Sequence, residues 1–221
     1  YGDAAATAYW PVGVHIDNMA TFNFNGVDIH GAQTGASSWA GVGIQINGST
    51  TLGGIGSHTT VHNLNSVIMY GLDIGVEYGT MVQGVALNSV NITKGRLGVH
   101  ITPNGVGIDQ LSVVGSQFGG MTGAAIACDA RLNCISLSNN LMIIPPGAYG
   151  ALILGDSFTI TGNVFAGTDQ ATSLEAIDVF GSVQGVISGN SISDVGLGVN
   201  LRAATSKVNV QANSYRNVTN N

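Results

Sequence analysis

Two short patterns alternate along almost the whole chain, and together they limit its fold more than any other feature of the sequence. In the first, a glycine precedes alternating apolar residues, and its clearest copies are Gly13–Ile16, Gly43–Ile46, Gly98–Ile101 and Gly198–Leu201. Looser copies of this pattern end at Val76, Cys128, Leu154 and Val179.

The second pattern is an apolar residue, two small polar residues that often include Asn, and then a bulky apolar residue. Its clearest copies begin at Leu137, Ile160, Ile187 and Val210, and degenerate copies begin at Phe24, Leu64, Leu87 and Val113. The two patterns therefore pair off, about eight copies of each, with a period near 24 residues.

A period of this length, with about three short strands in each period, predicts an all-β chain folded as one single-stranded parallel β-helix of about eight coils over residues 1–221. Parallel crossovers are almost always right-handed, so the β-helix is expected to be right-handed. A leucine-rich repeat would show a fixed Leu frame, a propeller blade needs a longer unit, and a sandwich would lack a phase shared between repeats.

Asparagines recur at one phase of the second pattern, at Asn140, Asn163, Asn190 and Asn213. We expect them to lie one above another at a turn, where Asn tolerates the left-handed conformation and its amide can bond to the next coil. These residues are therefore interpreted as structural.

Two segments depart from the repeat and are expected to be loop insertions. The segment His30–Ala40 lengthens one interval, and Trp39 is a candidate aromatic anchor within it. The segment Ile143–Tyr149 contains Pro145-Pro146-Gly147, which forces a turn. Loops on a solenoid tend to gather on one face and to carry binding residues.

Composition restricts the partners. Hydrophobic residues make up 44% of the chain and charged residues 8%, with a net charge of −6 and only six Lys and Arg. This balance argues against a disordered chain, a nucleic-acid partner and an anionic membrane surface, and no apolar run is long enough for a transmembrane helix. Soluble surfaces usually carry more charge, so we expect other copies of the chain to cover part of this surface.

The coil segments at 160–165 (Ile-Thr-Gly-Asn-Val-Phe) and 187–192 (Ile-Ser-Gly-Asn-Ser-Ile) resemble those of the pectate-lyase-like β-helix superfamily. Within it, the low charge and the Gly-, Ser- and Asn-rich coils are most similar to bacteriophage tailspike proteins. The resemblance implies a homotrimer on the phage tail, outside the cell, that binds bacterial surface polysaccharide and in intact form depolymerises it. Such proteins usually have a capping region and a trimerising domain; neither is recognisable here, so the chain looks like an excised piece.

Glycoside hydrolysis needs two carboxylates on either side of the bond that is broken. Adjacent coils bring equivalent positions close together, so acids at similar phases are candidates. Asp129 follows Cys128 and Asp156 follows Leu154, at nearly one phase, and the next coil carries Asp178 and Glu175. These four acids are the predicted catalytic residues, and scattered solvated acids are the alternative interpretation.

Further residues are candidates for binding the substrate. Arg131 is expected to bind an anionic sugar or to hold a carboxylate ionised, and His100 and Asn200 belong to an outward polar column that also holds His15 and Gln45. Tyr149 and Trp39 offer aromatic faces. No cofactor and no metal site are expected, because His58 and His62 lie in a turn and strand rather than on a helix.

Two other functions stay open. The chain is alternatively a non-catalytic structural or adhesive β-helix, such as a virion stalk or a surface passenger domain. A third candidate is an epimerase or pectin-type lyase, although few basic residues are present to act as its base.

Overall fold

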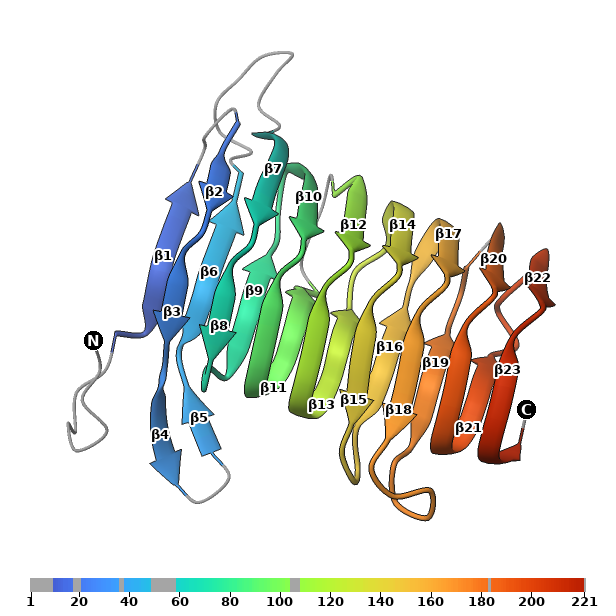
Figure 1. Cartoon of the computed structure of the whole chain (residues 1–221). Helices are drawn as coiled ribbons and strands as arrows, with labels where there is room; N and C mark the ends of the chain where they lie inside the picture. Colours follow the sequence, from blue (N-terminus) through green and yellow to red (C-terminus); the bar gives the residue numbers. More distant parts are fainter. Residues whose placement is uncertain are drawn as a thin grey trace.

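The computed structural model describes residues 10–17, 21–35, 38–48, 59–103, 108–182 and 184–220, and these residues form strands and turns without a helix (Figure 1). The strands are β1 (Val12–Asp17), β2 (Asn23–Asn25), β3 (Asp28–His30), β4 (Ala32–Gly35), β5 (Ser38–Ala40), β6 (Val42–Asn47), β7 (Thr59–Asn65), β8 (Ile68–Tyr70), β9 (Ile74–Tyr78), β10 (Val82–Asn88), β11 (Asn91–Ile101), β12 (Gln110–Val114), β13 (Gln117–Cys128), β14 (Leu132–Ser138), β15 (Leu141–Ile144), β16 (Tyr149–Ile153), β17 (Gly155–Thr161), β18 (Val164–Gly167), β19 (Glu175–Val179), β20 (Gln184–Ser188), β21 (Ser191–Leu201), β22 (Val208–Gln211) and β23 (Ser214–Asn220).

The strands lie in three parallel stacks, and each coil of the chain visits the three in turn. The first stack contains β1, β6, β9, β16, β19 and the C-terminal parts of β11, β13 and β21. The second stack is the sheet β2-β7-β10-β12-β14-β17-β20-β22. The third stack contains β3, β8, β15, β18, β23 and the N-terminal parts of β11, β13 and β21, which bend directly into the first stack of the next coil.

The chain rises along the back of the molecule and descends along the front as it advances from the N-terminal to the C-terminal end (Figure 1), so the coil is right-handed. The second stack holds eight strands, of which all but the first and the last have a neighbour on both sides. About six turns are therefore enclosed between others, and the predicted number of about eight includes the two end coils. The parallel β-helix expected from the repeat is confirmed.

Alternation of side chains builds the core inside the three stacks. In β12 every second residue is buried, which places Leu111 and Val113 inside. The eight anchor residues predicted by the second sequence pattern form one continuous inward column, Phe24, Leu64, Leu87, Val113, Leu137, Ile160, Ile187 and Val210. Each fully buried side chain of this kind stabilises the fold by about 1.5–3 kcal/mol.

A ladder of asparagine side chains joins the last four coils, as predicted. Asn163 shows its chemistry: its backbone N–H and its amide both donate to Oδ1 of Asn190, at 2.9 and 3.0 Å, and the amide also donates to the carbonyl of Leu137 at 2.9 Å. Asn140 bonds to Asn163 in the same way, and Asn190 to Asn213. Asn140, Asn163 and Asn190 are buried, so each amide satisfies backbone groups that water cannot reach.

The left-handed turn residue is the one before each ladder asparagine, not the asparagine itself. Asn139, Gly162, Gly189 and Ala212 have φ values of 56°, 66°, 64° and 53°. The prediction that the ladder asparagines adopt this conformation is therefore wrong. The preceding residue makes the turn, and the following asparagine is then aimed inward, where its amide reaches the neighbouring coil.

The two interruptions of the repeat take different forms. Strands β4 and β5 pair as an antiparallel hairpin that projects from the body (Figure 1), and the Trp39 ring lies 6.1 Å from the Tyr70 ring. Between β15 and β16 the chain makes a tight turn, in which Ala148 N–H donates to the Pro145 carbonyl at 3.2 Å and Gly147 has a φ of 74°.

His62 is buried in β7 on the inward side, next to the Phe22 ring at 6.1 Å. Neither ring nitrogen has a hydrogen-bond partner. Desolvation lowers the pKa of His62 below its ordinary value, so the folded state holds the ring neutral.

We expect Asn163→Leu to lower the free energy of unfolding by about 2–5 kcal/mol, because it leaves the buried backbone N–H of Asn140, one N–H of the Asn140 amide and the carbonyl of Leu137 without partners. Urea unfolding followed by circular dichroism measures this. Asn209→Ala, at an exposed position of β22, is the matched control and should change stability by less than about 0.5 kcal/mol. Equal effects of the two substitutions would contradict the structural role of the ladder.

We expect His62→Leu to stabilise the protein, and to do so more at pH 5 than at pH 8. A lowered histidine pKa means that the unfolded chain takes up a proton first, so the native protein loses stability as the pH falls below the unfolded value of about 6.5. The leucine removes this loss together with two unsatisfied nitrogens. Thermal melts at the two pH values test it, and a gain that does not grow at low pH would argue against a neutral buried ring.

Candidate functional site

The first stack presents two outward columns of side chains, three residues apart on each strand. One column holds Val42, Ile74, Leu97, Ala124 and Tyr149, and continues at Glu175 and Leu197. The other holds His15, Gln45, Glu77, His100, Ala127, Leu152, Asp178 and Asn200. The outward polar column expected from the sequence is therefore present, but Ala127 and Leu152 divide it into two polar groups.

An apolar cluster separates these polar groups and is distinct from the main core. It consists of buried Ile74, Leu97, Ala124 and Ala127, with Val42, Tyr149 and Leu152 packed against it. Tyr149, a predicted binding residue, is half-buried and lies at the edge of this cluster. The Tyr149 ring therefore lies between apolar neighbours on one side and the coil of Glu175 on the other, since Ala151 pairs with Ile177.

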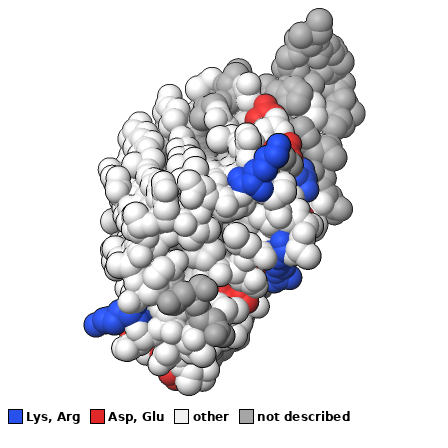
Figure 2. Space-filling view, turned by 90° about the vertical axis from the view of Figure 1, so that its right-hand side faces the viewer, with Lys and Arg blue, Asp and Glu red and all other residues white. Residues whose placement is uncertain are grey.

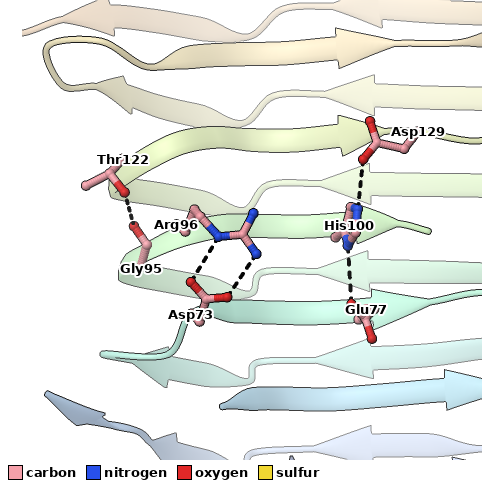
Figure 3. Close-up of polar contacts among 7 residues, drawn as sticks. All are labelled: Asp73, Glu77, Gly95, Arg96, His100, Thr122 and Asp129. Carbon is pink, nitrogen blue, oxygen red and sulfur yellow. Dashed lines mark hydrogen bonds and ion pairs between the residues drawn. The ribbon is translucent and has the colours of Figure 1, made fainter. Parts of the chain in front are cut away.

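The first polar group is centred on His100, which lies between two carboxylates (Figure 3). His100 Nδ1 is 3.2 Å from Glu77 Oε2, and Nε2 is 3.0 Å from Asp129 Oδ2. Gln45 donates to the other oxygen of Glu77 at 2.7 Å. His100 and Glu77 are largely buried, while the Asp129 side chain is 48% exposed. The imidazole fills the space between the carboxylates and links three consecutive coils.

Arg96 lies close to this group (Figure 3) and makes a two-pronged contact with Asp73, at 3.0 and 2.9 Å. The hydrogen bond to Asp73 is the main reason that the pKa of Arg96 is raised, and the charges of Asp73, Glu77 and Asp129 add to it. The electrostatic potential around this part of the first stack is therefore negative.

The second polar group lies near the C-terminal end and contains predicted catalytic and binding residues together. Asp178 is fully buried beneath Arg202, whose guanidinium donates to both of its oxygens and lies 5.6 Å from the centre of the Phe180 ring. Asn200 donates its amide to both oxygens of Glu175, at 3.2 and 3.4 Å.

Glu175 differs from the neighbouring acids because its hydrogen-bond partner is a neutral amide. Burial raises the pKa of Glu175; the hydrogen bond from Asn200 opposes this rise, the charge of Asp178 adds to it and that of Arg202 opposes it. A carboxyl that stays protonated to higher pH than usual, beside one that Arg202 neutralises, is the arrangement in which a general acid is found.

Asp156 belongs to neither group. Arg131 donates to Asp156 at 2.7 Å and to the carbonyl of Gly181 at 2.5 Å, so it joins the coils that carry β14, β17 and the end of β19. Both side chains are about half exposed. Arg131 is thus already engaged by groups of its own chain.

The four predicted catalytic residues do not form one cluster in the structure. Glu175 and Asp178 are neighbours on β19, whereas Asp129 and Asp156 have different partners and do not occupy one phase. The cause is the register: Ile153, not Leu154, pairs with Val179, and Tyr78, not Val76, is the equivalent of Ile101. Asp156 therefore stands further along its coil than the sequence comparison indicated.

The remaining predicted binding residues also lie apart. Asn200 is beside Glu175, His100 is beside Asp129, and Trp39 is on the projecting hairpin. Sequence reasoning missed Glu77 and Arg202. The copy of the first pattern that the sequence places at Val76 ends at Tyr78 in the structure, so Glu77 was not assigned to the outward column. Arg202 follows directly after the last copy, which ends at Leu201.

A scan against models of protein families, a search of curated proteins and a search of solved structures each found no match for this chain. Among the described residues, no three His, Cys, Asp or Glu side chains are grouped so as to hold a metal ion. The described part of the chain also has no helix that could span a membrane. His58, considered with His62 as a zinc ligand, lies outside the described residues.

We expect Asp178→Asn to lower the melting temperature more than Asp156→Asn does. The first change removes the charge of a buried carboxylate that orients Arg202 over Phe180, while the second breaks an ion pair that solvent already screens and that contributes about 1 kcal/mol or less. Differential scanning calorimetry of both variants at one pH gives the comparison. A larger effect at Asp156 would show that the Asp178–Arg202 pair is not the stronger anchor.

Proposed function

We propose that the chain is a polysaccharide-binding β-helix of the phage tailspike type, which binds a bacterial surface polysaccharide through the outward side of its first stack. One observation carries this proposal: three consecutive coils put the ring of Tyr149, the carboxyl of Glu175 and the amide of Asn200 on the outward side of the first stack, with the amide bonded to the carboxyl. A ring flanked by hydrogen-bonding groups suits a sugar, which has apolar ring faces and hydroxyl edges.

The position of this face on the solenoid favours an extended ligand over a small one. Successive coils repeat at about 4.8 Å, so equivalent side chains form rows along the long axis of the molecule. A polymer that lies along the axis can contact several coils in succession. Repeat proteins commonly use such continuous faces for binding.

The homotrimer belongs to the same proposal. Figure 2 shows charged side chains in small groups, mainly on one side, with broad uncharged areas on the other. The eight strands of the second stack hold one acid, Asp156, and no Lys or Arg. A surface with so little charge is suited to contact with other copies of the chain.

Sedimentation at micromolar concentration tests whether the chain is a homotrimer. A monomer would contradict the proposal.

Cleavage of the polysaccharide is a second candidate function, and the raised pKa of Glu175 is the observation that favours it. Glu175 would act as the general acid that protonates the leaving oxygen. Arg202 covers Asp178, the nearest second carboxylate, so the arrangement supports binding better than hydrolysis.

Binding is tested with a panel of bacterial O-chains and capsular polysaccharides, by titration calorimetry with the purified chain. We expect at least one polymer to bind, and Tyr149→Ala and Asn200→Ala to weaken its binding by about tenfold or more, because each removes a stacking or hydrogen-bonding contact at the site. Asn209→Ala, on the second stack, is the control and should bind as the wild type does. A folded protein that binds none of the polymers would favour the structural or adhesive alternative.

Cleavage is tested by a reducing-end assay on any polymer that binds. If hydrolysis occurs, Glu175→Gln should lower its rate by about 100-fold or more while binding is kept, because the amide has nearly the same shape but cannot supply the proton. The rate of the wild type should fall as the pH rises through the raised pKa of Glu175. An active Glu175→Gln variant would remove Glu175 from the reaction.

A further inference from the structure

We infer that the polysaccharide bound at this site carries no carboxylate, phosphate or sulfate groups. The inference rests on the proposed function and narrows it, because bacterial surface polymers include both neutral and acidic kinds. It follows from where the few cations of the chain lie and from what each already binds.

The chain has six Lys and Arg in total, and all lie within its described parts. Every arginine is engaged by an aspartate of a neighbouring coil. The pairs are Arg96–Asp73 at 2.9 Å, Arg131–Asp156 at 2.7 Å, Arg216–Asp194 at 2.8 Å and Arg202–Asp178. The charge of a guanidinium that is held by a carboxylate is already balanced, so it attracts an anionic sugar less strongly than an unpaired cation would.

Arg202, whose charge acts on Glu175, and Arg131 each already give two donors to groups of the chain itself. Arg202 gives two donors to Asp178, and Arg131 gives one to Asp156 and another to the carbonyl of Gly181. For Arg202 to turn toward a uronate, it would have to leave Asp178 buried and without a counter-charge. Removing one partner of such a pair is strongly unfavourable, so this exchange would weaken binding.

The two lysines do not replace the arginines. Lys94 Nζ lies 5.4 Å from the centre of the Tyr70 ring, at the bend where β11 leaves the third stack. Lys207 borders a shallow hollow of about 380 Å³ on the second stack. The strand segments that lie in the first stack contain no Lys or Arg, since Lys94 and Arg96 precede the part of β11 that joins this stack at Leu97, so its outward side holds no free cation beside Glu175.

The acids on the first stack outnumber the cations that remain available. Glu77 is bonded to the neutral amide of Gln45 and to the ring of His100, Asp129 to the same ring, and Glu175 to the neutral amide of Asn200. With a net charge of −6 over the whole chain, the field at this face repels a polyanion. Hydroxyl groups, by contrast, can bond to these carboxylates and amides without meeting a like charge.

The decisive comparison uses one uronic-acid capsular polysaccharide before and after its carboxyl groups are reduced to alcohols, together with neutral O-chains. We expect the tightest ligand of the panel to be free of anionic groups, and the reduced polymer to bind at least about tenfold more tightly than its acidic parent. Binding of the neutral ligand should change less than about twofold between 0.05 and 0.5 M NaCl, because screening acts on charge pairs.

The outcomes separate the two proposals. Tightest binding by an acidic polymer, lost when its carboxyl groups are reduced, would overturn this inference and leave the proposed function in place. Binding of none of the polymers, acidic or neutral, would overturn the proposed function and this inference with it.

A variant with an added cation tests whether the lack of a free cation is what excludes acidic polymers. Leu152→Lys adds a cation to the outward column beside Asp178, and Leu152→Gln is its uncharged control. We expect the lysine variant to bind the acidic polymer about threefold to fivefold more tightly than the glutamine variant at low salt. No gain in the lysine variant, with both variants folded by circular dichroism, would contradict the explanation that a missing cation excludes acidic polymers.

Discussion

Contact between one coil and the next is the interaction on which the rest of this molecule depends. Apart from the β4–β5 hairpin, the strands of the described chain pair with strands of neighbouring coils and not within their own coil, so the N–H and carbonyl groups of the stacks rely on the coils above and below. The asparagine ladder makes this dependence specific. Asn163 accepts two hydrogen bonds from Asn140 through one oxygen and donates to Asn190, so a slip of one residue would leave several buried groups unsatisfied. The ladder therefore fixes the register, and the register fixes which outward side chains meet.

How much of this could be predicted from the sequence depends on which side of the strand a residue faces. All eight anchors of the inward column were identified, because each is an apolar side chain at the same phase of the repeat and faces the core of a narrow solenoid. The outward columns of the first stack were harder to identify. Their members are three residues apart, as at Leu97 and His100, because the strands are irregular between them, and a strict period of two does not predict such a step. Placing the end of one copy at Leu154 instead of Ile153 then moved Asp156 close to the phase of Asp129.

Like the asparagine ladder, the ion pairs of this chain join neighbouring coils. Asp73 and Arg96 are 23 residues apart, Asp178 and Arg202 are 24, and Asp156 and Arg131 are 25, which is one coil in each case. Charges arranged in this way neutralise one another inside the molecule and leave few cations for a partner. The selectivity proposed for the ligand therefore follows from the stacking, which aligns the coils and also pairs the few cations of the chain with its aspartates.

Glu175 is the exception to this pairing, and the exception bears on whether the site binds or cleaves. Its partial burial raises its pKa, and the hydrogen bond from the neutral amide of Asn200 opposes that rise only in part, so Glu175 stays protonated to a higher pH than an ordinary glutamate does. Cleavage would require a second accessible carboxylate besides Glu175. Asp178 would have to be uncovered, and that requires Arg202 to give up two hydrogen bonds and its contact with Phe180. Binding requires no such movement, since Tyr149, Glu175 and Asn200 already lie at the surface. If the site binds a polysaccharide as proposed, it can do so as it stands, whereas the proposed cleavage requires a ligand to displace Arg202.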